Sequence, residues 1–158
     1  MTVTLDALTL TGQAVGLHRA VSAVWLETGL VTHLEDDTGV GALIGDRIYP
    51  LQVPQDAELP ALAYQIITDR YEVTHDQRSE LSRARVQFTH VGTTYTALKS
   101  LSEAVRDALH QFTGDLGGVV VTGCLLDQDT DDWSGSHKSP VKRSDYIIWY
   151  KRIHLMGV

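Results

Sequence analysis

The sequence has a single cysteine, no Lys or Arg before Arg19, and no apolar run near the about 20 residues that cross a bilayer. One cysteine excludes an internal disulfide framework, and Cys124, between two aliphatic runs, is expected to be a small buried hydrophobe. The opening residues have neither the charged start nor the continuous apolar stretch of a secretory signal. We therefore expect a cytoplasmic product without a membrane span.

Basic residues are also scarce, since 13 Lys and Arg stand against 20 Asp and Glu, for a formal net charge of −7. Phosphate backbones are bound by clustered positive charge, so this balance excludes a protein that wraps nucleic acid with its whole surface. The remaining composition is that of a soluble globular chain. Its 158 residues suit one domain with a substantial core.

Motifs of metal binding are missing or incomplete. The seven histidines show no H-x-H or H-E-x-x-H spacing. Asp127, Asp129 and Asp131 match the opening of a calcium loop, but Asp132 stands where glycine is required and Lys138 where glutamate is required. We therefore predict no metal site and no cofactor.

Two short runs imitate enzyme motifs. Residues 139–142 spell S-x-x-K, but Pro140 opposes the helix on which that pair works. Residues 39–45 resemble G-x-G-x-x-G with the last glycine one position late, and they do not follow a predicted strand. We interpret them as a helix-to-strand turn, and we expect no catalytic residues and no enzyme activity.

Hydrophobic periodicity predicts an α+β fold. The predicted elements are helices over residues 17–37 and 94–112 and strands over residues 61–68, 81–91, 119–127 and 143–153. Their order, α-β-β-α-β-β, indicates an antiparallel or mixed sheet of about four main strands with two helices packed on one face. Residues 1–16 are predicted to be an extended N-terminal arm, and residues 17–158 a single domain.

The long polar segment over residues 128–142 is predicted to be a loop that contacts a neighbouring subunit. The candidate contact residues are Asp127, Asp129, Asp131, Trp133, Lys138, Lys142 and Arg143. The acidic and basic runs either pair across a hairpin, which contributes little when exposed, or meet the opposite run of another subunit. An exposed tryptophan is costly unless something covers it, so Trp133 is expected to contact a second subunit.

A small α+β enzyme or ligand-binding domain is the alternative from another class. Its site would form from dispersed polar residues on strands, such as His90, Arg85 and Asp145. A lone histidine on an apolar strand face is, however, more often a satisfied core or edge residue than a base. This alternative therefore depends on whether the fold brings the three residues together.

Several stretches, taken in order, resemble those of a known family. They are Val40–Pro50, Leu59–Gln65, Ser82–Phe88, Tyr95–Leu109 and Asp145–Tyr150. Over roughly residues 17–152 the chain resembles the tail-completion, or tail-terminator, family of long-tailed bacteriophages and prophages. The resemblance rests on the order of the stretches, not on one diagnostic motif.

This resemblance implies a structural virion protein, the subunit of a homo-oligomeric and commonly hexameric ring. The ring would cap the tail tube, terminate its polymerisation and join the tail to the head connector. The implied partners are the tail tube protein and a head-tail connector protein, with DNA passing through without sequence-specific binding.

The resemblance also implies a place in the virion, at the head-proximal end of the tail, after synthesis in the host cytoplasm. It implies no catalytic residues, no cofactor and no membrane. A head-to-tail connector, or neck, protein is the alternative within the virion.

Overall fold

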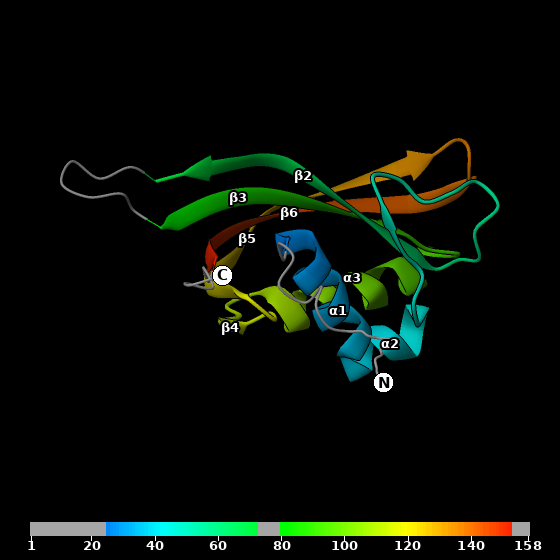
Figure 1. Ribbon diagram of the computed structural model, residues 1–158. Coiled ribbons are helices and arrows are strands. Elements are labelled where there is room, and N and C mark those ends of the chain that lie inside the picture. The colour runs from blue at the N-terminus through cyan, green and yellow to red at the C-terminus, as the bar shows by residue number, and fades with distance from the viewer. Residues whose placement is uncertain (1–24, 73–79, 153–158) are drawn as a thin grey trace, which may run out of the picture.

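The computed structural model describes residues 25–72 and 80–152 (Figure 1). The predicted arm over residues 1–16 and the first part of the predicted first helix lie outside these residues. None of the described helices is long and apolar enough to span a membrane.

The described residues form a curled sheet with helices on one side. The elements are α1 (Leu26–Asp36), α2 (Thr38–Ile44), β1 (Ile48–Pro50), β2 (Ala61–Tyr71), β3 (Leu81–Val91), α3 (Tyr95–Leu109), β4 (Gly114–Asp115), β5 (Val119–Ser134) and β6 (Ser139–Arg152). The strand order in the sheet is β1-β2-β3-β6-β5-β4. β1 and β2 are parallel and all other neighbours are antiparallel, so the sheet is mixed. Figure 1 shows it arching over the three helices as a half-barrel.

The predicted fold of about four strands and two helices in the order α-β-β-α-β-β is therefore wrong. The described residues are mostly β, with six strands and three helices in the order α-α-β-β-β-α-β-β-β. The two added strands, β1 and β4, have three and two residues, too short to produce a periodic pattern.

Two segments account for the other differences. Residues 39–45 were predicted to be a helix-to-strand turn, but residues 38–44 form α2. Asp37 caps this helix by accepting from the Val40 amide at 3.0 Å, and Val40 and Ile44 are buried. Residues 128–142, predicted to be a loop, belong to the long β5–β6 hairpin, whose turn is confined to residues 135–138. Tertiary burial and cross-strand pairing override the low propensities of glycine and aspartate there.

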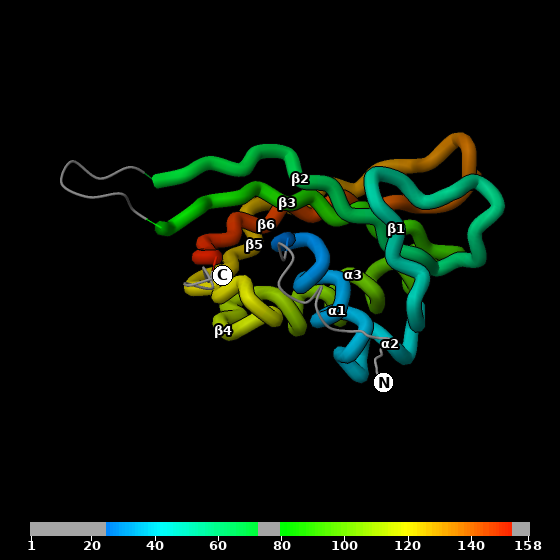
Figure 2. The backbone as a smooth tube through the Cα atoms, viewed as in Figure 1, coloured from blue at the N-terminus to red at the C-terminus, as the bar shows by residue number. Residues whose placement is uncertain are grey.

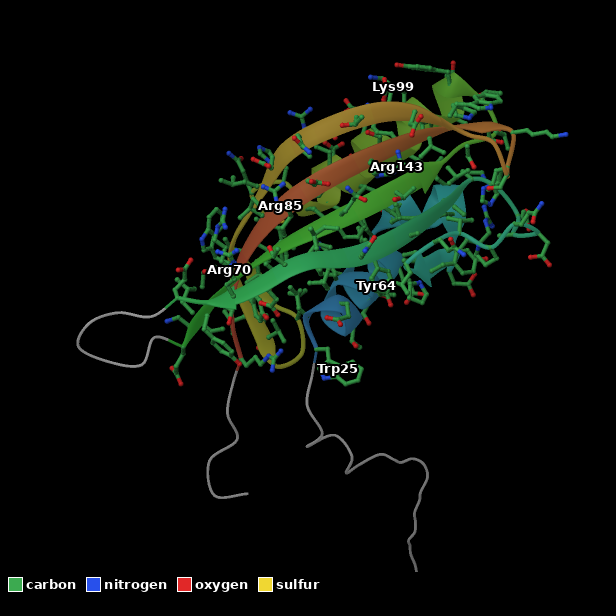
Figure 3. The ribbon with its side chains drawn as sticks, turned by 90° about the horizontal axis from the view of Figure 1, so that it is seen from above. Trp25, Tyr64, Arg70, Arg85, Lys99 and Arg143 are labelled. Carbon is green, nitrogen blue, oxygen red and sulfur yellow. The ribbon has the colours of Figure 1, made fainter. Side chains whose placement is uncertain are left out.

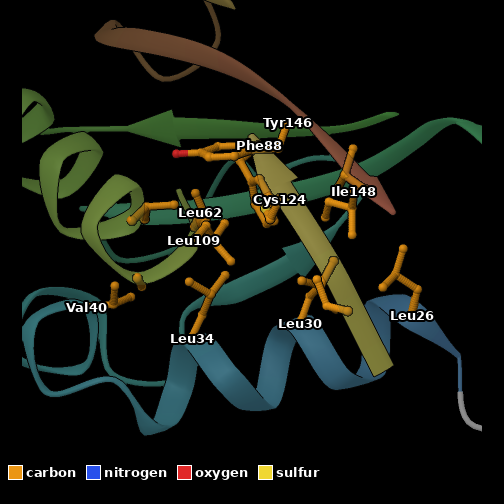
Figure 4. Close-up of a cluster of buried hydrophobic side chains, with 14 of the residues drawn as sticks. Leu26, Leu30, Leu34, Val40, Leu62, Phe88, Leu109, Cys124, Tyr146 and Ile148 are labelled. Atoms are coloured by element: carbon orange, nitrogen blue, oxygen red, sulfur yellow. The ribbon is translucent and has the colours of Figure 1, made fainter. Parts of the chain in front are cut away.

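The main core lies between the concave face of the sheet and the helices (Figure 4). On β3 every second side chain is buried, as the sequence alternation predicts. Across from the sheet, α1 buries Leu26, Leu30 and Leu34 at helical spacing. Cys124 lies in this core at 1% exposure, as predicted, and burial raises the pKa of its thiol to about 12.

α3 is the most regular of the helices. Thr94 caps it by accepting from the Ala97 amide at 3.1 Å. One face buries Leu98, Leu101, Ser102, Val105, Ala108 and Leu109. This amphipathic face packs on β3, β5 and β6 and fixes the curvature of the sheet around it.

The loop over residues 51–60 covers one end of the opposite, convex face of the sheet (Figure 2). It encloses a small second core of Val53, Ala61, Ala63, Val91 and Val141. His137 Nε2 lies 3.0 Å from the Pro54 carbonyl oxygen, which ties this loop to the β5–β6 turn. The rest of the convex face carries mainly polar side chains.

Gly92→Ala should destabilise the fold. An added Cβ at this position would lie 2.8 Å from the Leu98 backbone nitrogen and 2.9 Å from its Cα, and backbone atoms cannot move aside cheaply. We expect the free energy of unfolding in urea to fall by about 1–3 kcal/mol. The control is Gly135→Ala, where a Cβ meets nothing within 4 Å. Equal effects of the two substitutions would contradict this packing.

Candidate functional site

The outer half of the β5–β6 hairpin carries the predicted contact residues, and its charges pair across the two strands. Lys142 Nζ lies 2.7 Å from Asp131 Oδ1, and Arg143 Nη1 donates to Asp132 Oδ2 at 2.6 Å. Because successive residues alternate between faces, the two pairs lie on opposite sides of the sheet. Of the two arrangements predicted for the charged runs, pairing across a hairpin is present within the chain.

The first of these pairs includes a buried lysine. The Lys142 side chain is only 7% exposed, while Asp131 is half exposed and also accepts from the Tyr95 hydroxyl at 3.1 Å. Burial would lower the pKa of Lys142, but the bond to Asp131 and the charge of that carboxylate raise it above its ordinary value. The bond to Lys142 in turn lowers the pKa of Asp131. The pair therefore stays ionised at neutral pH.

His90 lies beneath this pair, fully buried on the concave face of the sheet. Its Nδ1 lies 3.0 Å from the Lys142 carbonyl oxygen, and its Nε2 has no hydrogen-bond partner among the described residues. Burial lowers the pKa of His90 to about 4. The imidazole is therefore neutral and sealed from solvent, in the core position that its strand pattern predicts.

A polar network on the convex face includes Arg85, labelled in Figure 3, and centres on Asp145, which is 6% exposed. Its carboxylate accepts from Arg85 Nη1 at 3.1 Å, from Gln87 Nε2 at 2.9 Å and from Gln128 Nε2 at 3.3 Å. Arg85 also donates to Asp127 at 2.8 Å. Three donors from neighbouring strands thus satisfy one carboxylate, and this network holds β3, β6 and β5 in register.

The alternative site of His90, Arg85 and Asp145 does not converge. Arg85 and Asp145 bond to each other on the convex face, whereas His90 is buried on the concave face, across the sheet. Among the described residues, no group of three or more His, Cys, Asp or Glu could hold a metal. Sequence reasoning noted the polar alternation of β3 but could not place Asp145 opposite it, since that depends on the register of distant strands.

The remaining predicted contact residues occupy different surroundings. Asp129 accepts from the Ser144 hydroxyl at 2.6 Å. Lys138 lies exposed in the hairpin turn at a φ of 51°, and no ion pair joins it to the other described residues. The Trp133 side chain is 61% exposed. Trp133 and Lys138 are therefore the members of the predicted set whose side chains remain free for an external contact.

Trp133 borders a depression of about 560 Å³ on the convex face. The floor includes Gln65, Gln87 and Thr89 from two neighbouring strands, and the loop that covers the second core forms the opposite wall. On that wall Leu51 is 69% exposed and has a φ of 69°, which is uncommon for a residue with a side chain. An exposed tryptophan and an exposed leucine thus border a polar floor.

Asp131→Ala should destabilise the chain more than Asp132→Ala. The first substitution leaves the buried Lys142 ammonium without its carboxylate, and we expect a loss of about 1–2 kcal/mol in the free energy of unfolding. The second removes a partner of the exposed Arg143, so its effect should be clearly smaller. Urea unfolding of both variants tests this, and the opposite ranking would contradict the burial of Lys142.

His90→Leu should reduce the acid sensitivity of the fold. Burial lowers the pKa of His90 from 6.5 to about 4, so between these values the unfolded chain binds a proton that the folded chain excludes. The free energy of unfolding therefore falls as the pH drops through this window, by up to about 1.4 kcal/mol per pH unit. Urea unfolding across the window should show a shallower decline for the variant. An identical decline would place His90 in contact with solvent.

Comparison with known proteins agrees with this architecture. The family model of tail completion protein gp17 matches residues 28–150. A chain in the solved structure titled "Virion of native gene transfer agent (GTA) particle" has a similar fold, with a TM-score of 0.58 at 17% identity, over 81% of this chain and 93% of that chain. No curated protein matches the sequence significantly. The resemblance predicted from the sequence is confirmed, and the chain belongs to the tail completion protein gp17 family, structural proteins of the bacteriophage tail.

Proposed function

We propose that this chain is the subunit of a homo-oligomeric ring, commonly of six copies, that caps the tail tube and terminates its polymerisation. The ring joins the tail to the head connector at the head-proximal end, and DNA passes through it without sequence-specific binding. The observation that carries this proposal is the family match over residues 28–150, which includes nearly every described element.

The chemistry of the polar residues supports a structural role without catalysis. The Asp145 carboxylate is occupied by three donors, and the ammonium of Lys142 is held by Asp131. Groups that satisfy one another in this way fix the shape of a surface and are not poised to react. His90, the remaining candidate base, is sealed in the core.

The contact between subunits is proposed to include the turn of the β5–β6 hairpin. Tryptophan is enriched among residues that dominate interface energies, and Trp133 stands exposed beside a depression that a neighbouring chain can enter. Lys138 offers an unpaired positive charge next to it. The other predicted contact residues, Asp127, Asp129, Asp131, Lys142 and Arg143, are engaged within their own sheet and shape this end of the chain.

Purified protein should form rings and stop the growth of self-assembling tail tubes. Native mass spectrometry gives the copy number, and negative-stain images of growing tubes should show rings on tube ends and a shorter mean tube length. Trp133→Ala should raise the dissociation constant of the ring at least about tenfold, because the anchor of the contact is lost.

The matched control is Trp25→Ala, which removes a second exposed tryptophan, 58% accessible, at the start of α1. Thermal unfolding should show that both variants are folded. A wild-type protein that forms no ring, alone or with tubes, contradicts the proposal. Binding to portal complexes in preference to tube ends would assign the chain to the neck connector instead.

A further inference from the structure

The curled sheet stays open, and its short outermost strands, β1 and β4, cover β2 and β5 only in part. β1 pairs with Leu62–Tyr64 alone, so residues 65–71 of β2 have no described strand on their outer side. At the other side, β4 pairs with Val120–Val121 alone. We name residues 65–71 the β2 edge and residues 127–133 the β5 edge. Such edges are templates for strand pairing.

Backbone groups of the β2 edge point away from the sheet. Leu62 and Tyr64 bond outward, to the segment that precedes β2. Along a strand, the amide and carbonyl of successive residues point alternately to the two sides of the strand. The bulge beyond Ile66 shifts this alternation by one residue. The amides and carbonyls of Asp69 and Tyr71 therefore point outward, where no described residue bonds to them.

The same reasoning applies to the β5 edge. The Cys124 carbonyl and the Leu126 amide bond outward, to residues 110–111 that follow α3. The bulge beyond Leu126 again shifts the alternation by one. The backbone groups of Asp129 and Asp131 therefore point outward, and the described helices leave them uncovered.

Charged side chains usually protect such an edge, and here several of them are engaged within the chain. On the β2 edge Asp69 accepts from the Tyr150 hydroxyl at 2.7 Å, while Arg70 is exposed. On the β5 edge the carboxylates are turned toward partners on their own sheet, as in the bonds from Asp129 to Ser144 and from Asp131 to Lys142. The β2 edge exposes two large apolar side chains, Ile67 at 42% and Tyr71 at 68%. The side chains of both edges thus leave the backbone open to pairing with another strand.

Strand direction allows the two edges to meet. β2 is antiparallel to β3, β3 to β6 and β6 to β5, so β5 runs opposite to β2. When a second copy in the same orientation is placed beside the first, the β5 edge of one meets the β2 edge of the next as antiparallel strands. Such a head-to-tail contact closes into a ring when the rotation per copy permits.

The stagger between the edges also suits closure. One row across the sheet joins Ala63, Thr89, Arg143 and Thr130, and Thr130 is the centre of the β5 edge. The centre of the β2 edge, Thr68, lies about four ladder positions beyond Ala63 once the bulge is discounted. Pairing the two centres therefore shifts the row by about four positions over the four strands β2, β3, β6 and β5, or about one position per strand. That is the shear that tilts strands by about 36° in closed eight-stranded barrels.

We propose that the β5 edge of one copy pairs antiparallel with the β2 edge of the next, so that one sheet runs through neighbouring subunits. The partner is a second copy of this chain. Backbone hydrogen bonds join the two strands, and Trp133, the last residue of the β5 edge, lies in the same contact. This inference rests on the proposed ring and specifies how its subunits join.

Proline substitution tests the pairing. Tyr71→Pro and Asp129→Pro each remove one outward amide without breaking a bond of the chain's own ladder, so both variants should keep a near-wild-type melting temperature. Native mass spectrometry should find no rings for either variant. Tyr71→Ala and Asp129→Ala are matched controls, because they lose the same side chains and keep the amides. These controls should still form rings.

A mixture of the two proline variants gives a sharper readout. Each variant keeps one intact edge, so a 1:1 mixture should form heterodimers and stop there. Amide hydrogen exchange in wild-type rings should show protection at Tyr71 and Asp129 that the monomer lacks.

The possible results separate this inference from the ring proposal. Rings formed by either proline variant overturn the edge pairing and leave the ring standing. Loss of rings in the alanine controls assigns the contact to side chains and also overturns it. Proline variants that form rings but no longer cap tubes place the edges against the tube protein instead. A wild-type protein without rings overturns both proposals.

Discussion

The structure depends on the burial of one apolar sheet face against a thin layer of helices. α1 and α3 present the apolar stripes that cover this face. Because a helix rises only about 1.5 Å per residue and a strand about 3.3 Å, both helices are shorter in space than β5 and β6. A flat sheet would leave much of that apolar face in water, whereas a curled sheet encloses the helices and removes the face from water. Curvature of the sheet is thus a consequence of how little helix the chain provides.

Because the helices occupy the concave side, the convex side must satisfy its own polar groups. It does so with cross-strand contacts around Asp145 and with the ion pair of Arg143 and Asp132. The loop over residues 51–60 covers the apolar end of the same face. The polar side chains of this face hold one another in place while the face stays exposed to solvent. Such a surface suits a protein that contacts other proteins.

Local patterns predicted the elements that carry them and missed those that depend on distant partners. β3 and α3 were predicted closely because their alternation and cap lie within the segment itself. α2 and the outer half of β5 were missed, since glycines and aspartates favour turns unless burial or a facing lysine offsets that preference. For the site, pairing across a hairpin was one of two predicted arrangements, while the Asp145 network required a register that no local pattern contains.

The burial of Cys124 has a practical consequence. It is the only cysteine in the sequence, and its pKa of about 12 keeps the thiol protonated and unreactive at neutral pH. A new cysteine at an exposed position would therefore be the only site for a fluorescent or spin label, with no need to remove the native one. Distances between such labels could then follow assembly in solution while the core of the protein remains unaltered.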